Sequence, residues 1–111
     1  MSNEVWKTVT LEGFLTEENS KYEVSNLGNI RSTNYRNTGE VKLLQPFIEK
    51  KTGYLKVCLY YKGKKRIVPL HRILFFAFNP NVDINAEIHF KDKNKLNVNL
   101  ENLVAEVREL N

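Results

Sequence analysis

His89 is the residue whose type and setting point most directly to catalysis. It lies near the end of a short extended stretch, residues 86–90, and a polar, asparagine-rich loop containing Asp92 follows over residues 91–99. A histidine beside side-chain oxygens is typical of a general base next to a hydrated hard cation such as Mg²⁺, because such cations take oxygen ligands. The alternative is a structural histidine that holds the loop by hydrogen bonds.

The other reactive side chains favour structural roles. His71 precedes a strongly apolar stretch, and we expect it to hydrogen-bond the backbone near a helix start. Cys58 is the only cysteine, so the chain has neither an internal disulfide nor a cysteine zinc cage, and we expect a buried thiol. No Gly-x-Ser-x-Gly motif and no phosphate-cradling glycine loop is present.

Positive charge is concentrated in one segment. Residues 42–72 carry nine basic side chains and one acid, a net charge of +8, whereas residues 1–41 and 73–111 are each net −2. A local basic patch attracts phosphate by Coulomb forces and counterion release. The alternative is that these lysines protect a sheet edge from aggregation. The cations predicted to contact DNA are Arg31, Lys56, Lys62, Lys64, Lys65, Arg66 and Arg72.

Two β-hairpins are predicted to position these residues. Residues 22–25 and 30–32 flank Asn26–Asn29, whose asparagines and glycine tolerate the positive φ of a tight turn. Residues 54–61 and 66–70 flank a lysine-rich turn over 62–65. A lysine-tipped ribbon of two strands has a shape that enters a DNA groove or follows a backbone. Residues 33–40 are predicted to form a loop, and residues 41–46 are predicted to be extended.

The C-terminal half combines a buried segment with a polar unit. Residues 71–78 lie between Pro69 and Pro80 and predict a short buried helix, with a buried strand as the competing assignment. Apolar residues at 100, 103, 104, 107 and 110 have helical spacing that Asn99 would cap, but residues 103–107 also suit a strand. The chain is therefore expected to be α+β, with small antiparallel hairpins and one short buried helix.

Length and composition limit the other possibilities. A chain of 111 residues forms one modest domain, and 41% hydrophobic with 27% charged residues is ordinary for a soluble globular protein. No apolar run approaches the roughly 20 residues of a membrane span, and the N-terminus has no signal-peptide pattern. We expect a cytoplasmic protein, and nothing in the sequence sets the oligomeric state.

The residue pattern resembles a known family. Trp6-Lys7 followed by the run from Tyr22 to Ser32 resembles the modular DNA-binding segment at the front of HNH homing endonucleases. The run from His89 to Asn97, followed by Glu101-Asn102-Leu103, is similar to the HNH core. The resemblance implies a DNA-binding motif over residues 1–48, then a basic hairpin with an HNH-like unit, a truncated ββα fold, over 49–111. It also favours a strand at 102–107.

The resemblance implies roles for individual residues. His89 matches the general base that activates water against a phosphodiester, and Asn111 matches the last metal ligand. Asn102 matches the asparagine that closes the loop, which we expect it to structure together with Asp92. Mg²⁺ or Mn²⁺ is the implied cofactor. One departure is Ile88, which stands where the family usually has Asp or Asn and has no lone pair to offer a metal.

Three functions follow as expectations. The first is a metal-dependent endonuclease acting on double-stranded DNA, of a phage or mobile-element type. The second is a catalytically degenerate relative that binds DNA. The third is a relative that binds a host protein, for instance as an inhibitor of a defence system.

Overall fold

The computed structural model describes residues 3–106 and begins with a four-stranded antiparallel sheet. Its strands are β1 (Trp6–Thr8), β2 (Tyr22–Ser25), β3 (Ile30–Tyr35) and β4 (Glu40–Leu43), in that spatial order. The predicted hairpin is present, with Val24 opposite Ile30. The predicted loop over residues 33–40 is wrong in its first part, because β3 continues to Tyr35, which pairs with Glu40 across an irregular register.

A second antiparallel sheet carries the basic segment. It contains β5 (Phe47–Ile48), β6 (Leu55–Tyr61) and β7 (Lys64–Pro69), and β6 pairs with β7 from Lys56–Pro69 to Tyr61–Lys64. The turn is shorter than predicted, because Lys62 and Gly63 both adopt positive φ, 50° and 76°, and close the hairpin with two residues. Lys64 and Lys65 therefore belong to β7.

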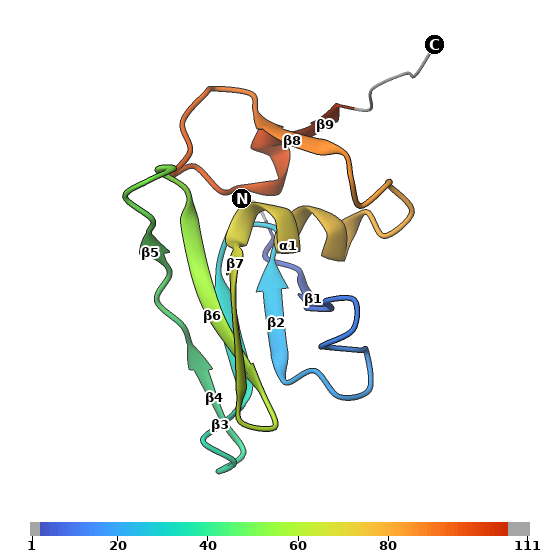
Figure 1. Cartoon of the computed structure of the whole chain (residues 1–111), viewed down its shortest axis with the longest axis vertical. Coiled ribbons are helices and arrows are strands. Elements are labelled where there is room, and N and C mark those ends of the chain that lie inside the picture. Colours follow the sequence, from blue (N-terminus) through green and yellow to red (C-terminus); the bar gives the residue numbers. More distant parts are fainter. Residues whose placement is uncertain (1–2, 107–111) are drawn as a thin grey trace.

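Helix α1 (Leu70–Phe78) follows β7 directly and confirms the predicted helix over the competing strand. Pro69 stands at its N-cap, where a missing N–H costs nothing, and the helix ends before Pro80. Figure 1 shows α1 lying across the end of β2 and β7 and beneath the C-terminal unit. One cluster of buried apolar side chains runs from Val9 through α1 to Leu103. It includes residues from both predicted segments, 1–48 and 49–111, and the division at residue 48 stays a prediction.

The C-terminal unit is a two-stranded antiparallel ribbon. Strand β8 (Glu87–Phe90) pairs with β9 (Leu103–Glu106), and a long loop and one turn of 3₁₀-helix, η1 (Leu100–Asn102), connect them. Asn99 caps η1 by accepting a hydrogen bond from the Glu101 N–H at 3.1 Å. The sequence left helix and strand open for the residues after Asn99. The structure has a strand at residues 103–106, which is paired along its length with β8.

The chain is α+β, as predicted, with mostly antiparallel strands and one α-helix in the described residues. Within residues 3–106 no helix is long and apolar enough to cross a lipid bilayer.

Candidate functional site

His89 lies on the solvent-facing side of the β8–β9 ribbon. Alternation along β8 buries Ile88 and exposes Glu87 and His89 on the same face. The imidazole is 49% exposed, and its Nε2 lies 2.6 Å from Glu106 Oε2 and 3.5 Å from Glu87 Oε2. Glu106 reaches this face from β9, where it is the register partner of Glu87. The structure therefore surrounds one imidazole nitrogen with two carboxylates.

The loop after His89 is organised by Asp92 and Asn102. The Asn102 amide donates to Asp92 Oδ1 and to the Asn97 carbonyl, both at 2.9 Å, and its own oxygen accepts from the Asp92 N–H at 3.1 Å. Asp92 also accepts from the Asn97 amide at 2.8 Å and from the Asn94 N–H at 2.8 Å. These bonds, that from Asn97 foremost, lower the pKa of Asp92. Asp92 and Asn102 therefore tie both ends of the loop together.

His71 packs in the core against Phe90 of the β8–β9 ribbon. Its ring lies between Tyr54 and Phe90, with centroids 4.8 and 4.9 Å away, and it is only 4% exposed. Burial, followed by the charge of Arg72, lowers the pKa of His71 from 6.5 to about 4. The expected hydrogen bond to the backbone is absent at Nδ1, which is buried and has no partner among the described residues. His71 is a neutral core residue beneath the site.

Ile88 occupies the position before His89, where the family resemblance implies Asp or Asn as a metal ligand. Ile88 is 7% exposed, belongs to the core and has no donor atom. Asn111, the residue predicted as a metal ligand, lies outside the described residues. The metal-ligating side chains that do lie together are Glu87, His89 and Glu106, whose ligand atoms are all within 4.8 Å of one another.

Three of the predicted DNA-contacting cations are held by a carboxylate or by carbonyl groups of the protein. Arg31 ion-pairs with Glu23 at 2.8 Å and stacks on the Trp6 ring at 3.8 Å. Lys56 ion-pairs with Glu49 at 2.8 Å. The Arg72 guanidinium donates to the carbonyls of Ile84 and Ala86, at 2.7 and 3.0 Å, and so holds the segment that leads into β8. We assign these three side chains to the fold.

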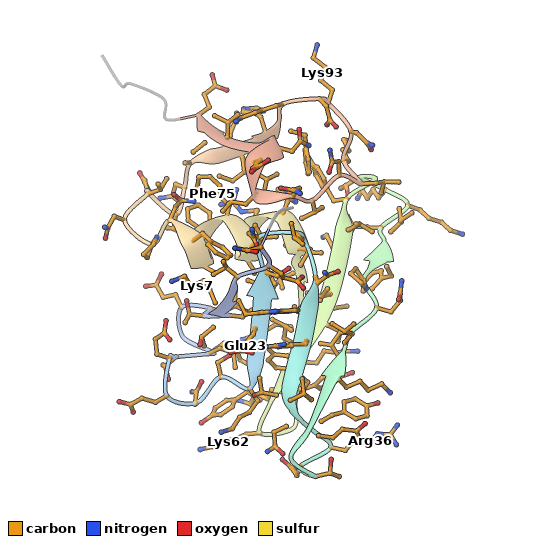
Figure 2. The ribbon with its side chains drawn as sticks, turned by 180° about the vertical axis from the view of Figure 1, so that it is seen from behind. Lys7, Glu23, Arg36, Lys62, Phe75 and Lys93 are labelled. Atoms are coloured by element: carbon orange, nitrogen blue, oxygen red, sulfur yellow. The ribbon has the colours of Figure 1, made fainter. Side chains whose placement is uncertain are left out.

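The remaining four cations form an exposed group on the β6–β7 hairpin, which we call the cationic tip: Lys62, Lys64, Lys65 and Arg66. None of the four is ion-paired within residues 3–106. A cavity of about 690 Å³ adjoins it, lined by Lys21, Arg36 and several tyrosines. Cys58 also lines this cavity and is half-buried, so the predicted burial of its thiol is only partial. Figure 2 shows Arg36 and Lys62 at one end of the molecule and Lys93 of the C-terminal unit at the other.

Sequence reasoning missed four residues that the fold brings to these two places. Glu87 and Glu106 flank His89, and only the β8–β9 register reveals that they are opposite each other. The i, i+2 spacing of Glu87 and His89 was the one local signal. Lys21 and Arg36 come from outside the basic segment and line the same cavity as Lys62 of the cationic tip. No local sequence pattern indicates that they approach Lys62.

The comparisons with known proteins agree with this architecture. Residues 4–60 match the NUMOD4 motif, and residues 68–108 match a family described as HNH endonuclease. The H-N-H endonuclease F-TflII of Escherichia phage T5 is 36% identical over 98 residues, which are 86% of this chain and 48% of that protein.

A solved structure describing DNA binding and cleavage by the HNH homing endonuclease I-HmuI has a similar fold. It superposes with a TM-score of 0.72 and 27% identity over 92% of this chain and 52% of the other. The chain thus spans about half the length of the relatives it matches. Two matched segments in the same order, a phage endonuclease relative and a shared fold lead to one conclusion: the chain belongs to the HNH homing endonuclease family.

Proposed function

We propose that this chain binds double-stranded DNA, with the cationic tip as its main phosphate contact. The observation that supports the proposal is the set of four exposed cations on one hairpin that no internal carboxylate neutralises within residues 3–106. The protein measures 49 Å along its longest axis, a length equal to about 14 base pairs of B-form DNA at 3.4 Å per step. The β6–β7 turn, which carries Lys62, and strand β8, which carries His89, lie toward opposite ends of the molecule, so DNA touching both must run along it (Figure 1).

Neutralising the tip is expected to flatten the salt dependence of DNA binding. Each lysine that contacts a phosphate contributes roughly 0.9 to the slope of log K against log salt, so a Lys62/Lys64/Lys65→Gln triple variant should reduce the slope by about 2.7. The measurement is fluorescence anisotropy of a labelled mixed-sequence duplex over a series of NaCl concentrations. The matched control is the same triple with arginine, which keeps the charge and should keep the slope. An unchanged slope in the glutamine variant would reject the tip as the contact surface.

Phosphodiester hydrolysis is a second candidate function, and it rests on the placement of His89. A carboxylate oxygen only accepts, so the short contact with Glu106 places a proton on Nε2 of the ring. The neutral imidazole then keeps its lone pair on Nδ1, where it can take the proton of an attacking water. The water oxygen would bond to phosphorus as the bond to the leaving sugar oxygen breaks. Ile88 does not fit a metal ligand, so no step is assigned to a metal.

His89→Ala is expected to slow DNA nicking at least 100-fold, which is the usual contribution of a general base. Supercoiled plasmid is incubated with each protein in Mg²⁺ or Mn²⁺, the cofactors that the family implies, and nicked product is followed on a gel. Glu101→Gln is the matched control, because that side chain is exposed, lies in the same unit and plays no part in the site. Equal nicking by the wild type and His89→Ala, or none by either, removes this candidate and leaves DNA binding in place.

A cytoplasmic location is compatible with a DNA-binding chain. The idea of a host protein as partner gains no support from the relatives, which are described as endonucleases.

A further inference from the structure

The cavity of about 690 Å³ beside the cationic tip is built from both larger sheets. Tyr22 lines it from β2 and Tyr60 lines it from β6. The β3–β4 turn contributes Arg36 and the β6–β7 turn contributes Lys62, and Figure 1 shows both turns at the same end of the molecule. Its volume lies within the range of about 300–1,000 Å³ that is usual for ligand sites. The cavity is therefore large enough to hold an organic ligand between the two sheets.

The charge of the cavity is positive. Lys21, Arg36 and Lys62 line it, and none of its described lining residues is aspartate or glutamate. None of these three cations is ion-paired within residues 3–106. Cations that no carboxylate neutralises attract anions, and clusters of lysine and arginine are typical of phosphate recognition. The cavity therefore suits an anionic ligand that carries a phosphate group.

Aromatic rings provide the other part of the cavity wall, which contains four tyrosines: Tyr22, Tyr35, Tyr60 and Tyr61. Lys42 Nζ lies 4.2 Å from the centre of the Tyr35 ring. The Tyr61 ring meets Phe14 edge-on, with the ring centres 6.1 Å apart. Tyr60 is 56% exposed, and its ring takes part in none of the ring–ring or cation–ring contacts of residues 3–106. Because every nucleic-acid base has a π face, an exposed ring of this kind is a stacking surface for a base.

We propose that the cavity binds one unpaired nucleotide, whose base stacks on Tyr60 and whose phosphate contacts Arg36 and Lys62. A nucleotide uses the ring and the cations together, whereas inorganic phosphate would leave the ring unused. The nucleotide has to be unpaired, because neighbouring bases cover both faces of a base inside a duplex. Lys65 of the cationic tip is the register partner of Tyr60, so a strand whose phosphates contact the tip can bring a base to the ring.

The nucleotide can belong to a DNA strand or be free in solution. The strand-borne case rests on the proposed DNA binding, and it identifies a strand end or an extruded base as the part of the DNA that the cavity holds. A free nucleoside monophosphate presents the same base and phosphate chemistry. Two arms of the experiment distinguish these sources.

The first arm compares two DNA ligands of equal charge. One is a labelled duplex with a 3′ tail of four thymidines, and the other has four abasic residues in the same positions, with the same phosphates and no tail bases. Fluorescence anisotropy with the full-length chain should give at least about fivefold higher affinity for the thymidine tail, which is the lower end of the effect of stacking one base. Such a preference supports the site and assigns it to a DNA strand.

Variants at Tyr60 connect the preference to the cavity. Tyr60→Leu should abolish the preference, and Tyr60→Phe, which keeps the ring, should retain it. Phe47→Ala is the matched control and should retain it too, because Phe47 is also an exposed aromatic residue, at 43%, but does not line the cavity. Circular dichroism checks that every variant is folded. A preference that survives Tyr60→Leu would overturn the proposal.

The second arm is isothermal titration of the chain with dTMP in the absence of DNA. Saturable binding that Tyr60→Leu abolishes, together with equal affinity for the two tails, supports the site and assigns it to a free nucleotide. Salt-dependent binding of a blunt duplex, with neither a preference for the thymidine tail nor binding of dTMP, overturns only this inference. A chain that binds dTMP through Tyr60 and binds no DNA refutes only the proposed DNA binding.

Discussion

Gly28→Ala is expected to destabilise the protein by more than about 4 kcal/mol, a loss reserved for backbone clashes and large core defects. Gly28 closes the β2–β3 turn with φ at +95°, a region that alanine adopts only with strain. A Cβ there would overlap the carbonyl oxygen of Val98 and stand 3.0 Å from its carbon. Because the obstacle is backbone and not the end of a flexible side chain, the loop of the C-terminal unit must move away.

The contact at Gly28 joins the N-terminal sheet to the C-terminal unit. The Leu100 N–H donates to the Asn26 carbonyl at 2.8 Å beside it, so the N-terminal turn holds the loop between β8 and β9 directly. Displacing that loop shifts the start of η1 and with it β9, which carries Glu106. Gly28→Ala should therefore disturb the His89 site as well as stability, although Gly28 is far from His89 in the sequence.

Urea unfolding followed by circular dichroism measures the loss. Gly63→Ala is the matched control, because Gly63 also has positive φ, +76°, but a Cβ there meets nothing within 4 Å. Left-handed strain alone costs roughly 1–2 kcal/mol, and the control should lose no more than that. Equal losses in the two variants would show that the contact between Gly28 and Val98 has no energetic weight.

Elements with local signals could be predicted from the sequence. The β2–β3 turn was indicated by Asn26–Asn29, and the helix by apolar residues confined between prolines. Residues 103–106 could not be assigned from their own pattern, which suits helix and strand equally, and only the family resemblance favoured a strand. Their strand state depends on β8, about fifteen residues earlier, and pairing across such a loop leaves no local pattern.

The roles of the cations were the least predictable feature. Charge counting groups Lys56 and Arg72 with Lys62, but it cannot show which cations meet a carboxylate or a carbonyl. Glu49 neutralises Lys56, and two backbone carbonyls hold Arg72. Such pairings depend on strand register and loop geometry. The same reason explains why Glu106 was not predicted beside His89.

The folded state is also expected to lose stability in acid through His71. The folded pKa of His71 is about 4, below its ordinary value of 6.5, so the unfolded chain binds the proton more readily. This contribution to stability is complete above pH 6.5 and is lost progressively as the pH falls from 6.5 to about 4. A difference of this size between the pKa values corresponds to about 3 kcal/mol.

His71→Phe isolates the effect of the buried imidazole. Phenylalanine fills a similar volume between Tyr54 and Phe90 and removes the buried Nδ1 atom that has no partner in residues 3–106. Its stability at pH 7 should equal or exceed that of the wild type, because an unpaired buried polar atom is costly. Carboxylates such as Asp92 titrate in both proteins, and their contribution therefore cancels in the difference between the two.

Urea unfolding of both proteins at pH 7, 5.5 and 4.5 measures that difference. The free energy of unfolding of the wild type, relative to that of His71→Phe, should be about 2 kcal/mol lower at pH 4.5 than at pH 7. Most of the proton uptake linked to unfolding lies within this pH range. Parallel curves for the two proteins would mean that the imidazole reaches solvent in the folded state. The His71 ring would then not be a neutral core side chain packed against Phe90 of β8.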